Sequence, residues 1–220
     1  RPLMSNHARH RFALRSTRVA LSWLLLIAPA AQAVDVDPLW DFRRPELSEQ
    51  RFRAALESAS GDDALVLQTQ IARSYGLRKE FARAQDLLKA IEPMTRSASP
   101  EVQTRYALEL GRTYASATHP PESQTAESKD RARSAFQQAL RLAREARLDA
   151  LAIDAIHMLA FVDTAPADQL KWAQEALAVS LVSTQPAARR WEASIRNNLG
   201  YALHQLGRHD EALEQFRQAV

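Results

Sequence analysis

The stretch ASIRNNLGYALHQLGRHDEALEQFRQAV, residues 193–220, holds two amphipathic runs joined by a short turn. In the first run Leu199 and Leu203 lie four residues apart, so they share one face of a helix with about 3.6 residues per turn. Gly207 ends this run, as glycine commonly does after a helix. The second run has small and aromatic residues at spacings of four and three, namely Ala212, Phe216 and Ala219. The stretch therefore predicts a helix–turn–helix hairpin.

The same stretch has its small and aromatic residues at the positions of a known repeat. Small residues stand at the eighth, twentieth and twenty-seventh positions and an aromatic residue at the twenty-fourth: Gly200, Ala212, Ala219 and Phe216. The stretch resembles a tetratricopeptide repeat. This resemblance implies an all-α fold, a right-handed superhelical array of helix–turn–helix repeats.

Three earlier segments carry parts of the same pattern. The seventh, eighth and eleventh positions hold an apolar residue, a small residue and a tyrosine in two of them: Ile71, Ala72 and Tyr75, then Leu110, Gly111 and Tyr114. The third segment is less regular because His157 stands where a small residue is expected. His157 is either a ligand or catalytic group or a packed histidine that widens the helix pair, and we favour the second interpretation. We expect four repeats, over residues 65–93, 104–147, 150–183 and 193–220, with Pro93 closing the first.

The second repeat contains an insertion. Ala132 follows Gly111 by 21 residues, whereas Ala212 follows Gly200 by only 12. The excess falls in a polar segment with two prolines, which predicts a loop insertion over residues 115–130. It is either a recognition loop or a tolerated surface insertion, since a longer loop costs little entropy.

Residues 1–33 have the features of a secretory signal peptide. A basic segment precedes the short apolar run VALSWLLLIA, and Ala31-Gln32-Ala33 has the small-x-small form of a cleavage site. The apolar run is shorter than the roughly 20 residues that span a bilayer, so we expect cleavage after Ala33 and no stable membrane insertion. The chain has no cysteine that could take a lipid. We therefore expect a periplasmic or secreted protein, most simply in a bacterial envelope.

The net charge of +3 changes sign if this segment is removed. Five of the 29 basic residues precede Asp35, and none of the 26 acidic residues does. The remaining 24 basic residues and 26 acidic residues give a net charge of −2, and this negative charge disfavours a nucleic-acid partner.

Two elements are expected before the first repeat. Residues 34–46 include two prolines and lack a helical period, which predicts an extended leader. Residues 47–61 show helical periodicity and end on Gly61, so we expect an N-terminal helix that caps the apolar flank of the array.

The chain lacks the common sequence motifs of catalysis and cofactor binding. There is no glycine-rich phosphate loop, no His-Glu-x-x-His and no Gly-x-Ser-x-Gly. His204 and His209 straddle Gly207 and so are not expected to share a helix face as a metal pair. We expect no catalytic residues, no metal and no cofactor.

The resemblance implies instead a concave groove lined by the first helix of each repeat. The family's groove positions hold mainly arginines in the first two repeats and apolar or polar residues in the last two: Arg73, Arg105, Arg112, Asp154, Met158, Phe161, Asn197, Tyr201 and His204. This lining predicts a peptide or protein partner that is acidic at one end and apolar at the other. The expected function is a non-catalytic scaffold for protein–protein interaction. The alternative is an accessory repeat domain of a longer enzyme or assembly factor, because the last helix ends at Val220 without a polar capping helix.

Overall fold

A computed structural model describes residues 34–220. The predicted signal peptide and its cleavage site lie outside the described residues, apart from Val34 on the carboxyl side of that site. Within them the chain forms helices and no strand, as expected for an all-α fold. The helices are α1 (Pro45–Leu56), α2 (Gly61–Leu77), α3 (Phe81–Thr95), α4 (Pro100–Tyr114), α5 (Ala126–Glu145), α6 (Asp149–Val162), α7 (Pro166–Val182), α8 (Pro186–Arg189), α9 (Glu192–Gln205) and α10 (His209–Gln218), with 3₁₀ turns η1 (Asp37–Leu39) and η2 (Pro121–Ser123).

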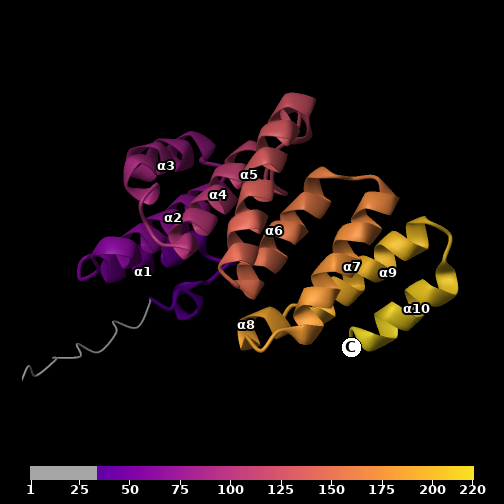
Figure 1. Cartoon of the computed structure of the whole chain (residues 1–220). Helices are drawn as coiled ribbons and strands as arrows, with labels where there is room; N and C mark the ends of the chain where they lie inside the picture. The colour runs from indigo at the N-terminus through magenta and orange to yellow at the C-terminus, as the bar shows by residue number, and fades with distance from the viewer. Residues whose placement is uncertain (1–33) are drawn as a thin grey trace, which may run out of the picture. The chain divides into compact units, whose positions relative to one another are not determined.

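The helices form consecutive packed pairs, as Figure 1 shows from α1 in indigo to α10 in yellow. The pairs are α2 with α3, α4 with α5, α6 with α7, and α9 with α10. Each pair also contacts the next, and the short helix α8 lies between α7 and α9 in the chain. The described residues therefore form an array of packed helical repeats.

A glycine in the first helix of two pairs allows the second helix to approach closely. The ring of Phe136 on α5 lies against Gly111 on α4, and Phe216 on α10 lies against Gly200 on α9 in the same way. A Cβ atom on either glycine would stand 2.4 or 2.5 Å from the ring, which is closer than carbon atoms approach. The two contacts have the same geometry although the second repeat carries the insertion.

The insertion is shorter than predicted, because α5 begins at Ala126 and the loop spans residues 115–125. Thr125 caps α5 by accepting a hydrogen bond from the backbone N–H of Ser128 at 3.1 Å. At its other end the loop folds back onto the first repeat. The hydroxyl of Thr118 donates to the carbonyl of Gly76 at 3.0 Å, and the ring of His119 stacks on Phe81 with centroids 3.7 Å apart.

Pro93 does not close α3, contrary to the sequence prediction. The helix continues to Thr95 with Pro93 inside its last turn. The missing N–H of this proline would have paired with the carbonyl of Lys89, and both residues are exposed, so water can satisfy that carbonyl.

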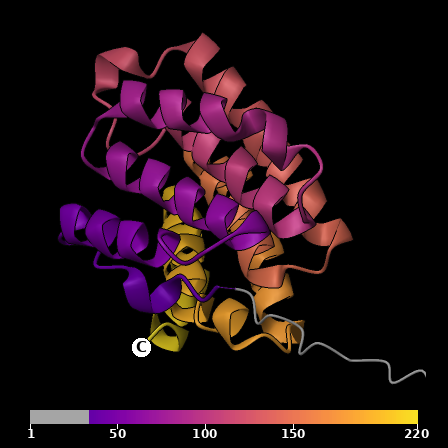
Figure 2. The same cartoon turned by 90° about the vertical axis from the view of Figure 1, so that its left-hand side faces the viewer.

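The N-terminal helix and the residues before it cover one end of the array. The helix was predicted over residues 47–61, whereas α1 spans Pro45–Leu56, so the leader is confined to residues 34–44. Val36 of the leader and Phe52 of α1 are buried in one apolar cluster with residues of α2 and α3. In Figures 1 and 2 the leader lies beside α2 at the indigo end of the array.

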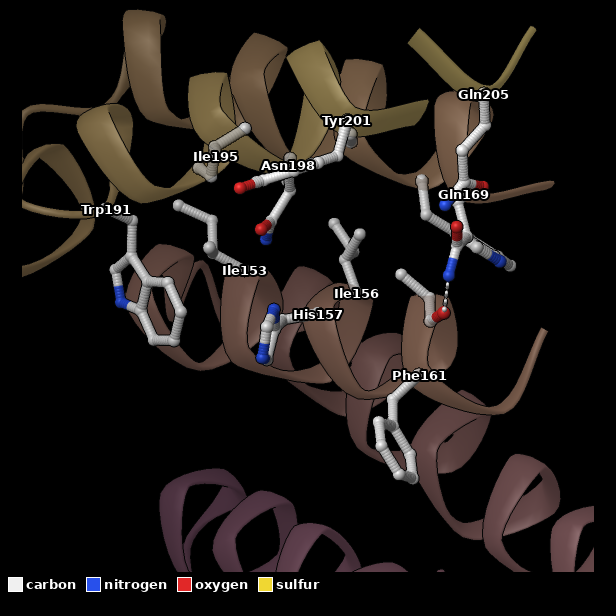
Figure 3. A pocket seen from close by; sticks show the side chains of 14 residues that line it. Ile153, Ile156, His157, Phe161, Gln169, Trp191, Ile195, Asn198, Tyr201 and Gln205 are labelled. Atoms are coloured by element: carbon white, nitrogen blue, oxygen red, sulfur yellow. Dashed lines mark hydrogen bonds between the residues drawn. The ribbon is translucent and has the colours of Figure 1, made fainter. Parts of the chain in front are cut away.

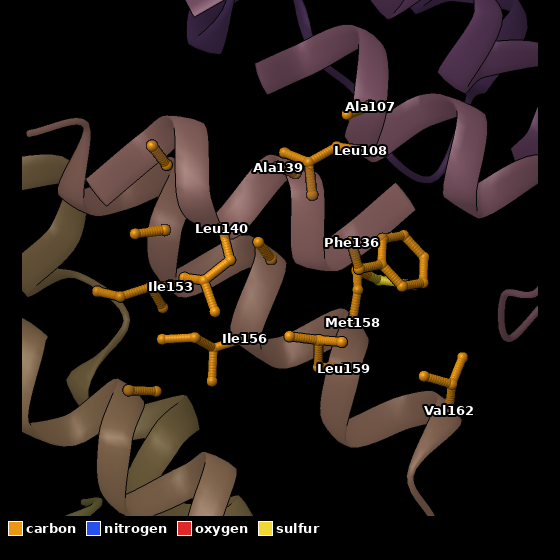
Figure 4. Close-up of a cluster of buried hydrophobic side chains, with 14 of the residues drawn as sticks. Ala107, Leu108, Phe136, Ala139, Leu140, Ile153, Ile156, Met158, Leu159 and Val162 are labelled. Carbon is orange, nitrogen blue, oxygen red and sulfur yellow. The ribbon is translucent and has the colours of Figure 1, made fainter. Parts of the chain in front are cut away.

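The largest apolar cluster lies in the middle of the array. Residues from α4, α5 and α6 contribute most of it, and Phe136, Ile153 and Leu159 are fully buried (Figure 4). This cluster fixes α6 against α5, and α6 in turn supplies side chains to the groove described below.

Candidate partner-binding groove

Two neighbouring cavities open along the first helices of the pairs. The charged cavity, of about 240 Å³, is lined by α2, α4, the insertion loop and α6. The apolar cavity, of about 290 Å³, is lined by α6, α7 and α9. His157, Phe161 and Trp191 line both cavities, so we treat the two together as one groove.

The apolar cavity is formed by side chains that point toward one another from α6 and α9 (Figure 3). Ile153 and Ile156 project from α6, and Ile195 faces them from α9. Trp172, Ala173 and Ala176 of α7 complete the apolar lining. This surface favours an aliphatic or aromatic side chain over a charged one.

Three amides add polar groups to the same cavity, namely those of Gln169, Asn198 and Gln205. The amide of Gln169 donates to the carbonyl of Ala160 at 3.4 Å, so this donor is already used. Asn198 forms no hydrogen bond with any described residue, although it is half-buried and lines the cavity. Asn198 therefore offers a donor and an acceptor to a peptide backbone entering the groove.

An internal ion-pair network occupies the charged cavity. Arg112 donates to Glu109 at 2.6 Å and to Asp154 at 2.5 Å, so it joins its own helix α4 to α6. The side chains of these three residues are only 11%, 3% and 10% exposed. Charges this deeply buried are retained because they are paired.

The pKa values of the two cavity arginines shift in opposite directions. Burial opposes the charged form of Arg112, but the carboxylates of Asp154 and Glu109 outweigh it and raise its pKa. Burial also acts against the ionised form of Asp154, and Arg112 together with Arg73 nevertheless lowers the pKa of that carboxyl. For Arg73, burial and the neighbouring Arg112 lower the pKa. Asp154 and Arg112 therefore stabilise each other's charged forms, whereas the charged form of Arg73 is the less stabilised of the two arginines.

Arg73 has hydrogen-bonding capacity left over. Its nearest carboxylate contacts, with Asp154 and Glu109, are 3.7 and 3.8 Å long, beyond normal hydrogen-bond length. It forms no hydrogen bond with any described residue, and a quarter of its side chain is exposed in the groove. Its donors are thus free to meet a carbonyl or a carboxylate.

The structure places the predicted groove residues in three settings. Arg73, Arg112, Asp154, Met158 and Phe161 line the charged cavity, and Phe161 and Tyr201 line the apolar one. Met158 is also part of the central core, with 7% of its surface exposed. Arg105 lines neither cavity and pairs with Glu101 one turn away at 2.9 Å.

Asn197 and His204 were assigned to the groove, and they line neither of the two cavities. The cavity-lining residues of α9 are Ile195, Asn198, Tyr201 and Gln205, which recur at spacings of three and four. Asn197 and His204 each precede one of these residues, about 100° away around the helix, and both are exposed outside the cavities. On α9 the cavity-lining residue is therefore the one after the predicted position in two cases, whereas Tyr201 lines the cavity as predicted.

Arg112, which was predicted to attract an acidic partner, is paired with two carboxylates of the chain itself. Glu109 lies one turn before it on α4, and Asp154 reaches it from α6, so its charge is neutralised inside the array. The sequence shows that Glu109 lies one helical turn before Arg112. It does not show the contact with Asp154, which depends on how one repeat packs against the next.

Sequence reasoning missed Trp191 and underrated His157. His157 is exposed in the groove rather than packed between helices, and its ring centroid lies 5.7 Å from that of Trp191. The sequence signal that could have identified Trp191 is an aromatic residue at the end of the basic run AARRW, between α7 and α9.

His204 on α9 and His209 on α10 lie on different helices, and the turn between these helices brings their rings together. Gly207 adopts a positive φ of 75°, which reverses the chain and brings the two Nδ1 atoms to 3.2 Å. Both rings are exposed. No group of three or more metal-ligating side chains occurs among residues 34–220.

Comparison with known families identifies the last hairpin. A tetratricopeptide-repeat model matches residues 193–220. This segment is a tetratricopeptide repeat. Such repeats are generally non-catalytic and suggest a scaffold for protein–protein interaction. No curated protein matches the chain. None of the described helices is both long and apolar enough to cross a membrane.

Proposed function

We propose that this chain is a non-catalytic scaffold of the bacterial envelope that binds an extended peptide or a protein segment in its groove. The observation that carries this proposal is the continuity of the two cavities through His157, Phe161 and Trp191. A segment lying across these residues would place an apolar side chain among Ile153, Ile156 and Ile195. Its backbone would meet the unused groups of Asn198 and Arg73.

The groove matches the usual chemistry of a peptide site. Such sites combine an apolar pocket with a few polar groups that fix orientation. The charges of the groove cancel, because Arg73 and Arg112 face Glu109 and Asp154, and Arg73 is the member of this cluster that keeps free donors. We therefore assign most of the binding energy to an apolar anchor in the apolar cavity and orientation to Arg73 and Asn198.

The envelope location rests on the cleavage site after Ala33 and gains support from Val34. The backbone nitrogen of Val34 donates to Asp63 at 3.0 Å, near the start of α2. After cleavage this nitrogen would be an ammonium group beside a carboxylate, which strengthens the contact. Sequencing of the exported protein's N-terminus tests this location, and an intact N-terminal segment on membrane-bound material would contradict it.

Site-specific photo-crosslinking in envelope preparations tests the groove. A photo-reactive residue is placed at Tyr201 or Gln205, which line the apolar cavity, or at the matched exposed position Gln137 on α5. A partner bound in the groove is captured from the first two positions and not from the third. Capture from Gln137 alone would show that the partner uses the outer face of the array.

A further inference from the structure

The leader, residues 34–44, lies along α2 in an orderly succession of contacts. Val34 reaches Asp63 in the first turn of α2, and the indole N–H of Trp40 donates to Gln70 two turns later at 3.1 Å. Val36 is 4% exposed and belongs to the same apolar cluster as Val66. The leader thus follows the helix in the same direction, although the 3₁₀ turn η1 interrupts it, so it is not extended throughout as the sequence predicted.

Its aromatic residues meet the one groove cation that has free donors. The rings of Trp40 and Phe42 stack with centroids 4.7 Å apart and planes 4° from parallel. The guanidinium carbon of Arg73 lies 5.6 Å from the first ring centroid and 5.5 Å from the second. Both distances are within the range of a cation–π contact. Arg73 lines the charged cavity, so the leader meets the groove at this residue.

The leader also makes a contact at the far wall of the groove. Asp37 pairs with Arg190 at 2.7 Å, and Arg190 directly precedes the groove residue Trp191. Both side chains are 64% exposed, and an ion pair this exposed stabilises by at most about 1 kcal/mol. Phe42 likewise remains 59% exposed despite its stacking. These two contacts leave Asp37 and Phe42 exposed, and Val36 is the buried anchor that must be released when the leader leaves.

We propose that the leader is an internal ligand of the groove. The site it occupies accepts in trans an acidic segment with the spacing of Asp37, Trp40 and Phe42, that is, an acid followed by an aromatic pair. The aromatic pair binds Arg73 and the acid binds Arg190. A partner segment of this chemistry displaces the leader and gains access to the rest of the groove. This inference rests on the groove being a binding surface, as proposed above.

The probe for this proposal is a fluorescein-labelled peptide of residues 34–44, VDVDPLWDFRR, added to the chain beginning at Val34. In the parent the internal leader competes, so the peptide binds weakly. The variant with Trp40→Ala and Phe42→Ala loses this competition and should bind the peptide about tenfold more tightly. The matched control Arg43→Ala, an exposed residue of the same leader, should bind it as the parent does. A peptide with both aromatic residues replaced by alanine should not bind.

A second measurement leaves Trp40 and Phe42 unchanged and instead fixes the leader in place with a covalent tether. The chain has no native cysteine, so Asp37→Cys and Arg190→Cys can be joined by a short bismaleimide. The joined protein should lose peptide binding, and the same variant before joining should bind as the single variant Arg190→Cys does, because both lack the arginine that receives the acid of the peptide. Equal binding before and after joining, or no gain in the aromatic variant with an unchanged melting curve, would overturn the proposal. The photo-crosslinks from Tyr201 and Gln205 are independent of this result, so failure of the internal ligand and failure of the groove are distinguishable.

Discussion

Gly111 and Phe136 are in contact so closely that a single methyl group on the glycine would overlap the ring. The added Cβ atom would lie 2.4 Å from Cε1 of Phe136 and within 3 Å of two other ring atoms. Phe136 is fully buried among residues of α4, α5 and α6, so the ring has no space to move into. The contact sets how closely α5 packs on α4.

Gly111→Ala should therefore destabilise the array by roughly 1–3 kcal/mol, as overpacking does. Gly76→Ala is the control, since nothing lies within 4 Å of its Cβ position and alanine favours a helix by about 1 kcal/mol over glycine. Gly200→Ala should cost less than Gly111→Ala, because Phe216 is only partly buried and can shift. Thermal melts of the three variants decide the order. A melt of Gly111→Ala that matches the parent's would mean that the ring yields freely.

The close crossings show what the sequence alone could predict. The pattern of small and aromatic residues identified the hairpins and the small positions Gly111 and Gly200, because these features lie within one repeat, and the structure adds their contacts with Phe136 and Phe216. The partners of Arg112 and the groove face of α9 depend on how one repeat packs against the next. The leader escaped prediction for the same reason, since its contacts with Gln70 and Arg190 lie 30 and 153 residues away in sequence.

Arg112→Met should destabilise the protein by about 3–5 kcal/mol, because it leaves Asp154 and Glu109 buried without their main partner. Arg105→Met is the matched control, because its pair with Glu101 spans one helical turn and such pairs contribute only about 0.3–0.5 kcal/mol. Urea denaturation of both variants measures the difference. The double variant Arg112→Met with Asp154→Leu should recover much of the loss. If the two single variants lose equal stability, the ion pairs on α4 are equivalent and the buried network has no special role.

The loop histidine His119 should make the array sensitive to mild acid. Burial lowers the pKa of His119, and its ring sits between the hydroxyl of Ser116 at 2.9 Å and the carbonyl of Thr113 at 3.1 Å. A histidine with a lowered folded-state pKa binds fewer protons when folded than when unfolded. Its contribution to stability is therefore complete above about pH 6.5 and is lost as the pH falls below that value.

His119→Gln should remove this part of the pH dependence. Denaturation between pH 7.5 and 5 is compared for the parent and the variant, and the difference in stability should shrink as the pH falls. His157 is exposed in the groove, but the side chains around it exclude part of the water and lower its pKa as well, so His157→Gln is measured in parallel to separate the two contributions. A constant difference across this range would show that His119 contributes packing on Phe81 and no proton-linked stability.

Filling the apolar cavity should block the partner and leave the fold intact. Ala160 lines this cavity on α6 and is only partly buried, so the larger side chain of Ala160→Phe can enter the open space of about 290 Å³ instead of the core. The added ring would occupy the volume that we assign to the partner's apolar anchor. Because the anchor could then no longer insert, the binding affinity should fall by about 2 kcal/mol or more. Ala178→Phe, at an exposed position of α7, is the matched control.

Photo-crosslinking from Gln205 reports the outcome for each variant alongside its melting curve. Loss of the crosslink in Ala160→Phe alone, with both melts near the parent's, places the anchor in the apolar cavity. Equal crosslinking in the two variants would mean that the partner contacts the rim of the groove without inserting a side chain, and the anchor would then have to be sought beside Arg73.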